Sequence, residues 1–300
     1  MPLKNCKTET EQQLSISRVL YAKNFTLTVN RKLCKGCDVC KTICPREAIE
    51  LKPIPKQEGE NAQAPVVDVN EEKCDYEGVC VAMCPFNAIS LSIDGETRNP
   101  VVDQECFPTL VRELVINDLH CKPNCKLCEE CPLEIINVIF GPLSHEEASS
   151  QNIEIKRASQ KTIVKVKKDL CACCRVCEAT CPVHVIQVQK FFNGSIKIYQ
   201  DRCPEGCHDC FDVCPVSALS LGDDGKVYAN DMFCIYCKAC SNVCPKPEAL
   251  EVQRTSIIHT PIKSGAWNQA LEKLTSPTGV RKELRVKGSN KAVEAVKKLC

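Results

Sequence analysis

Aromatic side chains are scarce in this chain. Phe, Trp and Tyr make up 5% of its 300 residues, and there is one tryptophan. Proteins that bind single-stranded nucleic acid stack bases on aromatic rings, so the composition does not favour a nucleic-acid-binding protein. Apolar residues are also few, because the hydrophobic fraction of 44% includes 27 cysteines and only about 35% remains without them. A chain with so little apolar material usually needs disulfides, metal or a partner to be stable.

Long apolar runs and the common catalytic motifs are also absent. No stretch approaches 18 apolar residues, so we expect no membrane span. Residues 1–33 lack the apolar core and cleavage site of a secretory signal, so we expect a cytoplasmic protein with reduced cysteines. The motifs G-x-G-x-x-G, G-x-x-x-x-G-K-[ST], H-E-x-x-H and G-x-S-x-G do not occur, and we expect no catalytic residue.

Cysteine is abundant and is arranged in six repeated units. Each unit has a short strand-like segment, a run of cysteines, a Cys-Pro pair and a second segment that alternates apolar and polar residues. The first cysteines of units 1 to 6 are Cys34, Cys74, Cys121, Cys171, Cys203 and Cys234. The leading strands are expected over 25–29, 66–69, 114–116, 162–166, 195–199 and 226–228.

One unit is too small to bury a core by itself, so we expect the units to pair as 1 with 2, 3 with 4 and 5 with 6. The alternative pairs 2 with 3 and 4 with 5 and leaves two units alone. The first arrangement predicts an N-terminal arm over 1–24, domains over 25–98, 99–190 and 191–253, and a tail over 254–300. The tail is basic over 281–300, and its segments 266–274 and 290–299 have helical apolar spacing.

The cysteine spacing differs in detail between units. Units 1, 4 and 6 contain C-x2-C-x2-C-x3-C-P without departure. Unit 5 has one residue inserted after Cys203, and unit 3 has a shorter last gap. Unit 2 lacks its second cysteine and has Glu77 in the gap.

This spacing suits an iron–sulfur cluster. Three cysteines at two-residue intervals can hold three corners of a cubane, and the fourth, next to a helix-ending proline, ligates the other cluster of a pair. Thiolates bind zinc equally well, but a zinc ribbon uses separated C-x2-C pairs and has no need of a Cys-Pro ligand. The repeated motif therefore favours iron–sulfur clusters over zinc or disulfides.

The motifs resemble those of bacterial-type 2[4Fe–4S] ferredoxins, and the tandem array over about 25–253 resembles the archaeal polyferredoxins. The resemblance implies an α+β fold of three tandem ferredoxin domains with two cubanes each and crossed ligation between the paired units. It also implies six [4Fe–4S] clusters, whose ligands we call ligand sets 1 to 6. The sets are Cys34, Cys37, Cys40 and Cys84 (set 1); Cys74, Cys80 and Cys44, with Glu77 (set 2); Cys121, Cys125, Cys128 and Cys181 (set 3); Cys171, Cys174, Cys177 and Cys131 (set 4); Cys203, Cys207, Cys210 and Cys244 (set 5); and Cys234, Cys237, Cys240 and Cys214 (set 6).

Ligand set 2 is the exception, because it has three cysteines. Glu77 either binds iron as a harder oxygen ligand or faces solvent beside an open-cornered or [3Fe–4S] cluster. No metal other than cluster iron is expected.

Four cysteines belong to no set. We expect Cys173 to be an unligated neighbour of Cys174 and Cys106 to be a buried free thiol. Cys6 and Cys300 lie in the expected arm and tail, where they need no role.

Two segments refine the resemblance. Residues 254–271 (RTSIIHTPIKSGAWNQAL) and 107–113 (FPTLVRE) are similar to the polyferredoxin subunit of archaeal formylmethanofuran dehydrogenase. That similarity implies clusters in a row that relay low-potential electrons to or from a tungsten or molybdenum enzyme reducing CO2, with the catalytic sites on partner subunits. The segment around Trp267 is expected either to dock a partner or to pack on its own domain.

Two other functions remain open. The chain could be an electron carrier or wire for a hydrogenase or heterodisulfide reductase complex. It could also be a structural zinc-binding interaction module.

Overall fold

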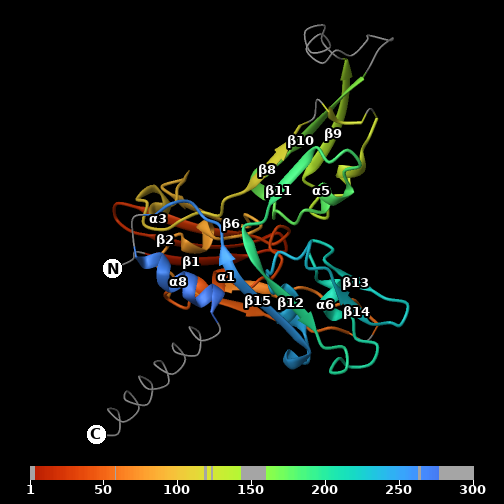
Figure 1. Cartoon of the computed structure of the whole chain (residues 1–300). Coiled ribbons are helices and arrows are strands. Elements are labelled where there is room, and N and C mark those ends of the chain that lie inside the picture. Colours follow the sequence, from red (N-terminus) through yellow and green to blue (C-terminus); the bar gives the residue numbers. More distant parts are fainter. Residues whose placement is uncertain are drawn as a thin grey trace.

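The computed structural model describes residues 4–57, 59–117, 120–122, 124–142, 160–262 and 265–276. The expected helix over 290–299 lies outside these residues. In Figure 1 the strands of units 3 and 4 extend away from the rest of the molecule, while those of units 5 and 6 lie beside the N-terminal part. Within the described ranges, no helix has the length and apolar character needed to cross a membrane.

The strands pair between units, and every pair is antiparallel. In units 1 and 2, β3 (Asn24–Asn30) pairs with β6 (Ile89–Ile93), and β4 (Ile49–Lys52) pairs with β5 (Val66–Val69). In units 3 and 4, β8 (Glu113–Ile116) pairs with β11 (Ile186–Gln189), and β9 (Ile136–Pro142) pairs with β10 (Gln160–Val166). In units 5 and 6, β12 (Phe192–Ile198) pairs with β15 (Leu250–Ile257), and β13 (Leu219–Leu221) pairs with β14 (Val227–Ala229). The first strand of each odd unit therefore contacts the last strand of the next unit.

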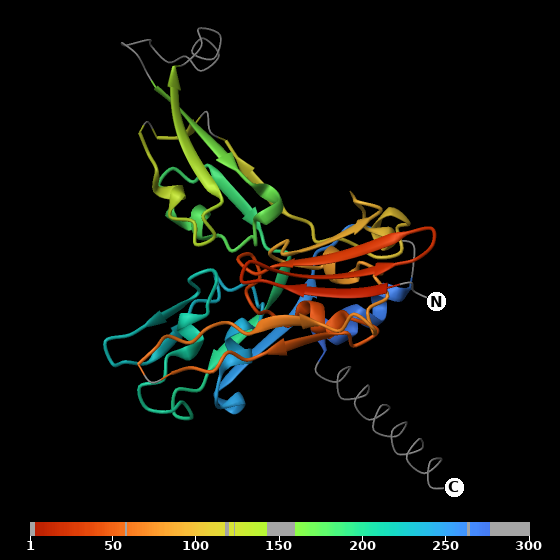
Figure 2. The same ribbon diagram turned by 180° about the vertical axis from the view of Figure 1, so that it is seen from behind.

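The N-terminal segment, expected as an arm, contains two strands. β1 (Lys4–Glu9) and β2 (Gln13–Val19) add to β3 and, with β6 and β7 (Glu96–Thr97), form a five-stranded sheet in the order β1-β2-β3-β6-β7. Leu14 and Ile16 alternate with more exposed residues and are 1% exposed, as in a half-buried strand. Seen from behind, these strands lie side by side (Figure 2).

A one-turn helix follows the first cysteines of each unit and includes the third cysteine of the motif. These helices are α1 (Val39–Ile43), α2 (Val79–Ala82), η2 (Leu127–Glu129), α5 (Val176–Thr180), α6 (Asp209–Asp212) and α7 (Ala239–Val243). Their ends reflect the Cys-Pro pair: Cys44, Cys181 and Cys244 are extended, because a residue before proline is disfavoured in the α region. Short helices also occur at α3 (Pro100–Asp103), η3 (Lys168–Leu170) and η4 (Pro247–Ala249).

The tail begins as a strand and continues as a helix. β15 runs to Ile257, beyond the expected domain end at 253. The helix α8 (Ala266–Thr275) coincides with the helix expected over 266–274. Trp267 is 2% exposed, contacts Phe107 edge to face at 5.2 Å, and donates a hydrogen bond from Nε1 to Nε2 of His259 at 2.8 Å. Of the two expectations for Trp267, packing on its own chain is the one observed, and its indole is not exposed to a partner.

Candidate iron–sulfur sites

Three cavities are each lined by one predicted ligand set. One cavity is lined by the four cysteines of set 6, and another by the four cysteines of set 4. A third is lined by the three cysteines of set 2 together with Glu77. Most other lining residues of the first two cavities are apolar, such as Val216 and Leu219 in the first and Ile136 and Val188 in the second. Clustered thiols in an apolar cavity suit a bound group with soft metal ions.

The other sets also bring distant cysteines together. In set 1, burial raises the pKa of Cys34, Cys37 and Cys40, and the nearby charge of Cys84, far along the chain, raises each pKa further. In set 3, burial is the main cause that raises the pKa of Cys128, and the nearby charge of Cys181 contributes to the same increase. In set 5, burial and then Cys244 raise the pKa of Cys210 to about 12.

Backbone N–H groups point at the sulfur of the Cys-Pro cysteines. Ala48 donates to Sγ of Cys44 at 3.4 Å, and Ala88 donates to Sγ of Cys84 at 3.2 Å. The intervening residue Glu47 or Asn87 has a positive φ of 49°, which turns the chain back toward the sulfur. Such donors stabilise a thiolate, and they also tune a cluster's reduction potential.

Cys173, expected as an unligated neighbour, has a structural role of this kind. Its backbone N–H donates to Sγ of Cys171 at 3.4 Å, and its φ of 54° places it in the left-handed turn between two ligands. Tyr236 does the same for Cys234 in unit 6, also at 3.4 Å. Cys173 is fully buried.

Cys106 and Cys6, the other two described cysteines outside the ligand sets, lie in different surroundings. Cys106, expected to be buried, is half-buried, and its thiol lies 3.5 Å from the carbonyl of Gln104. Cys6 lies in β1 rather than in an arm. No disulfide links any cysteine in the described part of the chain. Cys300 lies outside it.

Burial favours the neutral form of several ligand thiols when no metal is bound. Burial raises the pKa of Cys174 and Cys234 to about 11 and that of Cys177 to about 12. Cys171 is an exception, because a hydrogen bond from the thiol of Cys173 lowers its pKa. A metal ion reverses the effect of burial, because a coordinated thiol is deprotonated. Among the described residues, no three His, Cys, Asp or Glu side chains converge on a single metal ion, and the thiols instead surround cavities.

Glu77 is held at the wall of the set 2 cavity. The side-chain amide of Asn99 donates to the carbonyl oxygen of Gly78 at 3.1 Å. Gly78 has a φ of +86°, and a Cβ there would lie 2.3 Å from Oδ1 of Asn99, so the turn requires glycine. Burial, and then the charge of Asp75, raise the pKa of Glu77.

Three cationic side chains contact the ligand loops, and none of them was expected from the sequence. Arg112 donates to the carbonyl oxygens of Cys84, at 2.9 Å, and of Cys171. Arg254 donates to that of Cys237 at 3.2 Å, and Lys190 to that of Cys234 at 2.8 Å. Arg112 and Arg254 lie in the two family-like segments, which was an available signal, whereas nothing in the sequence distinguishes Lys190.

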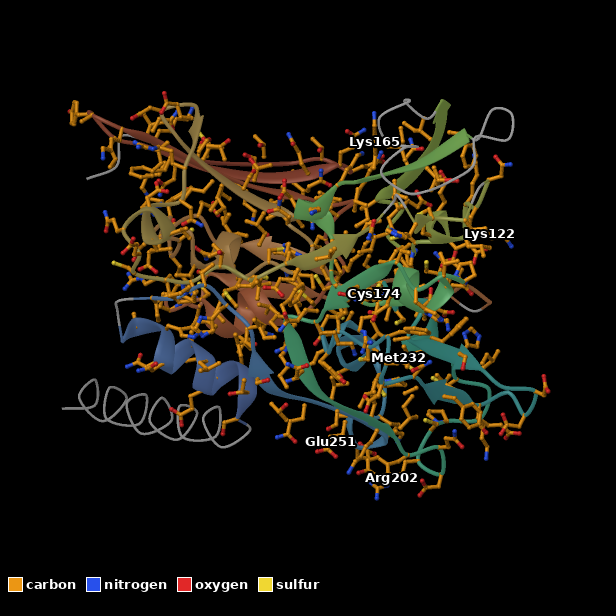
Figure 3. The ribbon with its side chains drawn as sticks, turned by 45° about the horizontal axis from the view of Figure 1, so that its top comes forward. Lys122, Lys165, Cys174, Arg202, Met232 and Glu251 are labelled. Atoms are coloured by element: carbon orange, nitrogen blue, oxygen red, sulfur yellow. The ribbon has the colours of Figure 1, made fainter. Side chains whose placement is uncertain are left out.

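The ligand sets do not follow one another in sequence order. Arg112 joins loops of sets 1 and 4, and the charge of Cys237 in set 6 acts on Cys37 in set 1. Figure 3 shows Cys174 of set 4 near the middle of the molecule, whereas Lys122 and Arg202, beside the first cysteines of units 3 and 5, lie toward its edge. These contacts bring loops of sets 1, 4 and 6 near one another, although the three sets belong to different pairs of units.

Comparisons with known proteins find similarity to iron–sulfur proteins. Residues 33–88 match the 4Fe-4S dicluster domain family. Polyferredoxin protein MvhB of Methanothermobacter marburgensis is 30% identical over 110 residues, which cover 34% of this chain and 25% of that protein. Hydrogenase-4 component A of Escherichia coli is 37% identical over 83 residues, or 25% of this chain and 40% of that protein. The chain thus aligns with less than half of either curated relative.

A solved structure matches nearly the whole chain. A chain of the formate dehydrogenase–heterodisulfide reductase–formylmethanofuran dehydrogenase complex from Methanospirillum hungatei superimposes with a TM-score of 0.78 at 30% identity. The match covers 92% of both chains. With its repeated cysteine loops and ferredoxin-like strand pairs, this chain belongs to the polyferredoxins, electron-transfer proteins built from 4Fe–4S dicluster domains.

Proposed function

We propose that this chain is the polyferredoxin subunit of a formylmethanofuran dehydrogenase complex and relays low-potential electrons to or from its tungsten or molybdenum enzyme. The observation that carries the proposal is the structural match over 92% of the chain to a subunit of a complex named for that enzyme. The two segments that resemble the formylmethanofuran dehydrogenase subunit, 107–113 and 254–271, also support it. Phe107 packs on Trp267, and Arg112 and Arg254 donate hydrogen bonds to the ligand loops. The reduction of CO2 would take place on partner subunits in the cytoplasm.

The proposal includes six [4Fe–4S] clusters bound by ligand sets 1 to 6. When bound, such clusters supply one-electron transfer. The residues of this chain provide the thiolate ligands, the apolar cavity walls that exclude water, and the N–H donors to sulfur. No side chain of this protein is proposed to act on a substrate.

For ligand set 2 we propose that Glu77 is the fourth ligand. Its place in the wall of the cavity, beside Cys74 and Cys80, supports iron binding rather than a solvent-facing role. An oxygen ligand would set the potential of this cluster apart from the others, since potential depends on ligand type and charge.

A second function is favoured by a separate observation. The similarity to a hydrogenase component, and the presence of heterodisulfide reductase in the name of the matched complex, support a wire for one of those enzymes. It differs from the first in its partner and not in its clusters.

Native isolation tests the proposal. The complex is purified anaerobically from cells that produce this chain, and its subunits, iron and acid-labile sulfide are determined. Co-purification of a formylmethanofuran dehydrogenase catalytic subunit, with about 24 iron atoms per chain, is the expected result. Hydrogenase or heterodisulfide reductase subunits without that enzyme would favour the second function. Stoichiometric zinc without sulfide would contradict both.

A further inference from the structure

Three cationic side chains lie where the central ligand sets meet. Arg112 connects the loops of sets 1 and 4, Arg254 connects the loops of sets 1 and 6, and Lys190 lies beside set 6. Each donates to a backbone carbonyl of a predicted ligand cysteine. An electron added to a cluster adds negative charge, so a nearby cation favours the reduced form, and more strongly where water is excluded. Any such effect rests on the proposed function, in which clusters occupy the ligand sets.

Arg112 bridges two pairs of units. Its guanidinium donates to the carbonyl oxygens of Cys84 and Pro85 and to that of Cys171. Its Cζ also lies 5.2 Å from the ring centre of Phe191. The charge of Arg112 is therefore held between ligands of sets 1 and 4.

Arg254 is the most deeply buried of the three, with a fully buried side chain. Nε donates to the carbonyl oxygen of Tyr236 at 2.8 Å, and Nη2 donates to Oδ1 of Asp38 and to the carbonyl oxygen of Cys237. Nη1 is buried and has no hydrogen-bond partner among the described residues. Lys238 also pairs with Asp38, at 3.6 Å, so two cations face one carboxylate here and the net charge beside set 6 is positive.

Lys190 completes the arrangement. Nζ donates to the carbonyl oxygens of Asp231, at 2.6 Å, and Cys234, at 2.8 Å. Nζ also lies over the ring of Tyr236, 5.1 Å from its centre, so Lys190 is held beside the loop that carries Cys234 and Cys237 of set 6.

The segment after Lys190 carries two rings that separate the arginines. Phe191 and Phe192 are each 1% exposed and meet edge to face, with ring centres 4.8 Å apart. The guanidinium of Arg112 lies over Phe191 and that of Arg254 over Phe192, each with Cζ 5.2 Å from the ring centre. These apolar rings exclude water, so the charges are poorly screened.

Outer set 5 has carboxylates beside its cysteines. Asp201 lies two residues before Cys203, and Asp209 and Asp212 flank Cys210. Negative charge disfavours reduction at set 5. Set 2 differs, because Asp75 beside Cys74 lies 2.8 Å from Arg46 and 3.9 Å from Arg18.

We propose that Arg112, Lys190 and Arg254 form a cationic junction that gives the clusters of sets 1, 4 and 6 higher reduction potentials than that of set 5. Sets 1, 4 and 6 then collect electrons, and outer set 5 exchanges them with partners. The three cations act as positioning and tuning residues and ligate no iron.

The test is a redox titration of the intact, iron-loaded chain, reduced stepwise with dithionite and followed by electron paramagnetic resonance. Arg254→Gln and Lys190→Gln each remove a positive charge, whereas Asp38→Asn removes the negative charge from the same ion pair. Arg254→Lys keeps the charge. Lys56→Gln is the matched control, because Lys56 pairs with Asp209 beside outer set 5.

We expect the portion of the signal that is reduced first to become at least tenfold harder to reduce in Arg254→Gln and Lys190→Gln, which is about 59 mV for one electron. Asp38→Asn should shift it in the opposite direction, and Arg254→Lys and Lys56→Gln should leave it near wild type. A purely structural role of the ion pair would move Arg254→Gln and Asp38→Asn in the same direction.

Shifts of the same sign in those two variants, or no shift at unchanged iron and sulfide content, would overturn the proposal. If Arg254→Gln does not retain iron, Lys190→Gln and Asp38→Asn are compared instead, and shifts of the same sign in these two variants would overturn the proposal. A wild-type chain that holds no iron and sulfide would instead overturn the proposed function, and the junction with it. Iron analysis therefore separates the two failures.

Discussion

At the scale of single residues, Glu77 is the position where the repeat departs most clearly from its own pattern. It occupies the place that Cys37 takes in unit 1, and the Gly78 turn and Asn99 hold its loop at the cavity wall. The glutamate that replaces a cysteine at this position of the repeat is therefore held at the cavity wall by its own turn.

Substitution of Glu77 tests its role directly. Glu77→Cys should keep the iron content and remove the spectroscopic contribution of an oxygen-ligated cluster, because it restores a soft ligand at the same position. Glu77→Ala should lose about one iron per chain, as a cubane with an open corner becomes a three-iron cluster. Iron analysis and electron paramagnetic resonance measure both changes.

The matched control is Glu72→Ala, an exposed glutamate of the same unit. Unchanged iron and spectra in Glu77→Ala would contradict ligation by Glu77.

At the scale of elements, α8 shows how packing decides between two expectations. The helix is amphipathic, so its sequence is compatible either with a partner surface or with its own domain. Contacts with α1 and β15 and the burial of Trp267, Ala270 and Leu274 decide for the second.

Trp267→Ala should therefore destabilise the chain by about 3–5 kcal/mol, the usual cost of removing a large buried aromatic side chain. Anaerobic denaturation of the iron-loaded protein, followed by loss of cluster absorbance and of far-ultraviolet circular dichroism, measures this. Gln269→Ala, at an exposed position of the same helix, is the control. Equal stability of the two variants would show that the helix contributes little to the fold.

The N-terminal strands make the complementary point. β1 and β2 carry no cysteine motif, and they lie in the segment expected to be an arm. They become strands because β3 offers an open edge, and the pair Lys7–Asp68, at 2.6 Å, ties β1 to β5. Strand edges of this kind depend on residues distant in sequence.

At the scale of the whole molecule, the cavities that hold thiols lie inside the core. Cys37, Cys40, Cys174, Cys234 and Cys237 are all less than 9% exposed and belong to the same apolar cluster as Val39 and Ile235. The few ordinary apolar residues of the composition are therefore supplemented by buried sulfur. Iron bound by these thiols would stabilise the folded chain further, because the unfolded chain has no preformed site.

Iron removal should accordingly unfold most of the chain, and iron retention should depend on pH. Burial raises the pKa of Cys174, Cys177 and Cys240 to about 11 or 12, so protons compete with iron for these sulfurs over the whole neutral range. As pH falls, the protonated thiol becomes more favourable and iron is released. We expect more iron to remain at pH 8.5 than at pH 6.5 against a chelator of calibrated affinity at each pH.

Circular dichroism and limited proteolysis of the iron-free chain measure the unfolding. Full retention of secondary structure without iron would mean that the apolar core suffices. Greater iron loss at pH 8.5 than at pH 6.5 would contradict competition by protons.

The cysteine loops and the short strands follow from local features of the sequence. Two-residue cysteine intervals, and proline after the last cysteine, act within one turn of backbone, so the cysteine loops and the Cys-Pro ends could be predicted without neighbours. The leading strands, such as Val66–Val69, follow from β-branched residues in alternation.

Contacts between different pairs of units depend on tertiary packing. The approach of Cys237 to Cys37 and of Arg112 to Cys171 joins residues that are 200 and 59 positions apart in the printed sequence. Such contacts depend on how whole sheets bury their apolar faces and how buried charges find partners, and no short spacing encodes either. For that reason the meeting of loops from ligand sets 1, 4 and 6, with Arg112 and Arg254 between them, could be seen only in the folded chain.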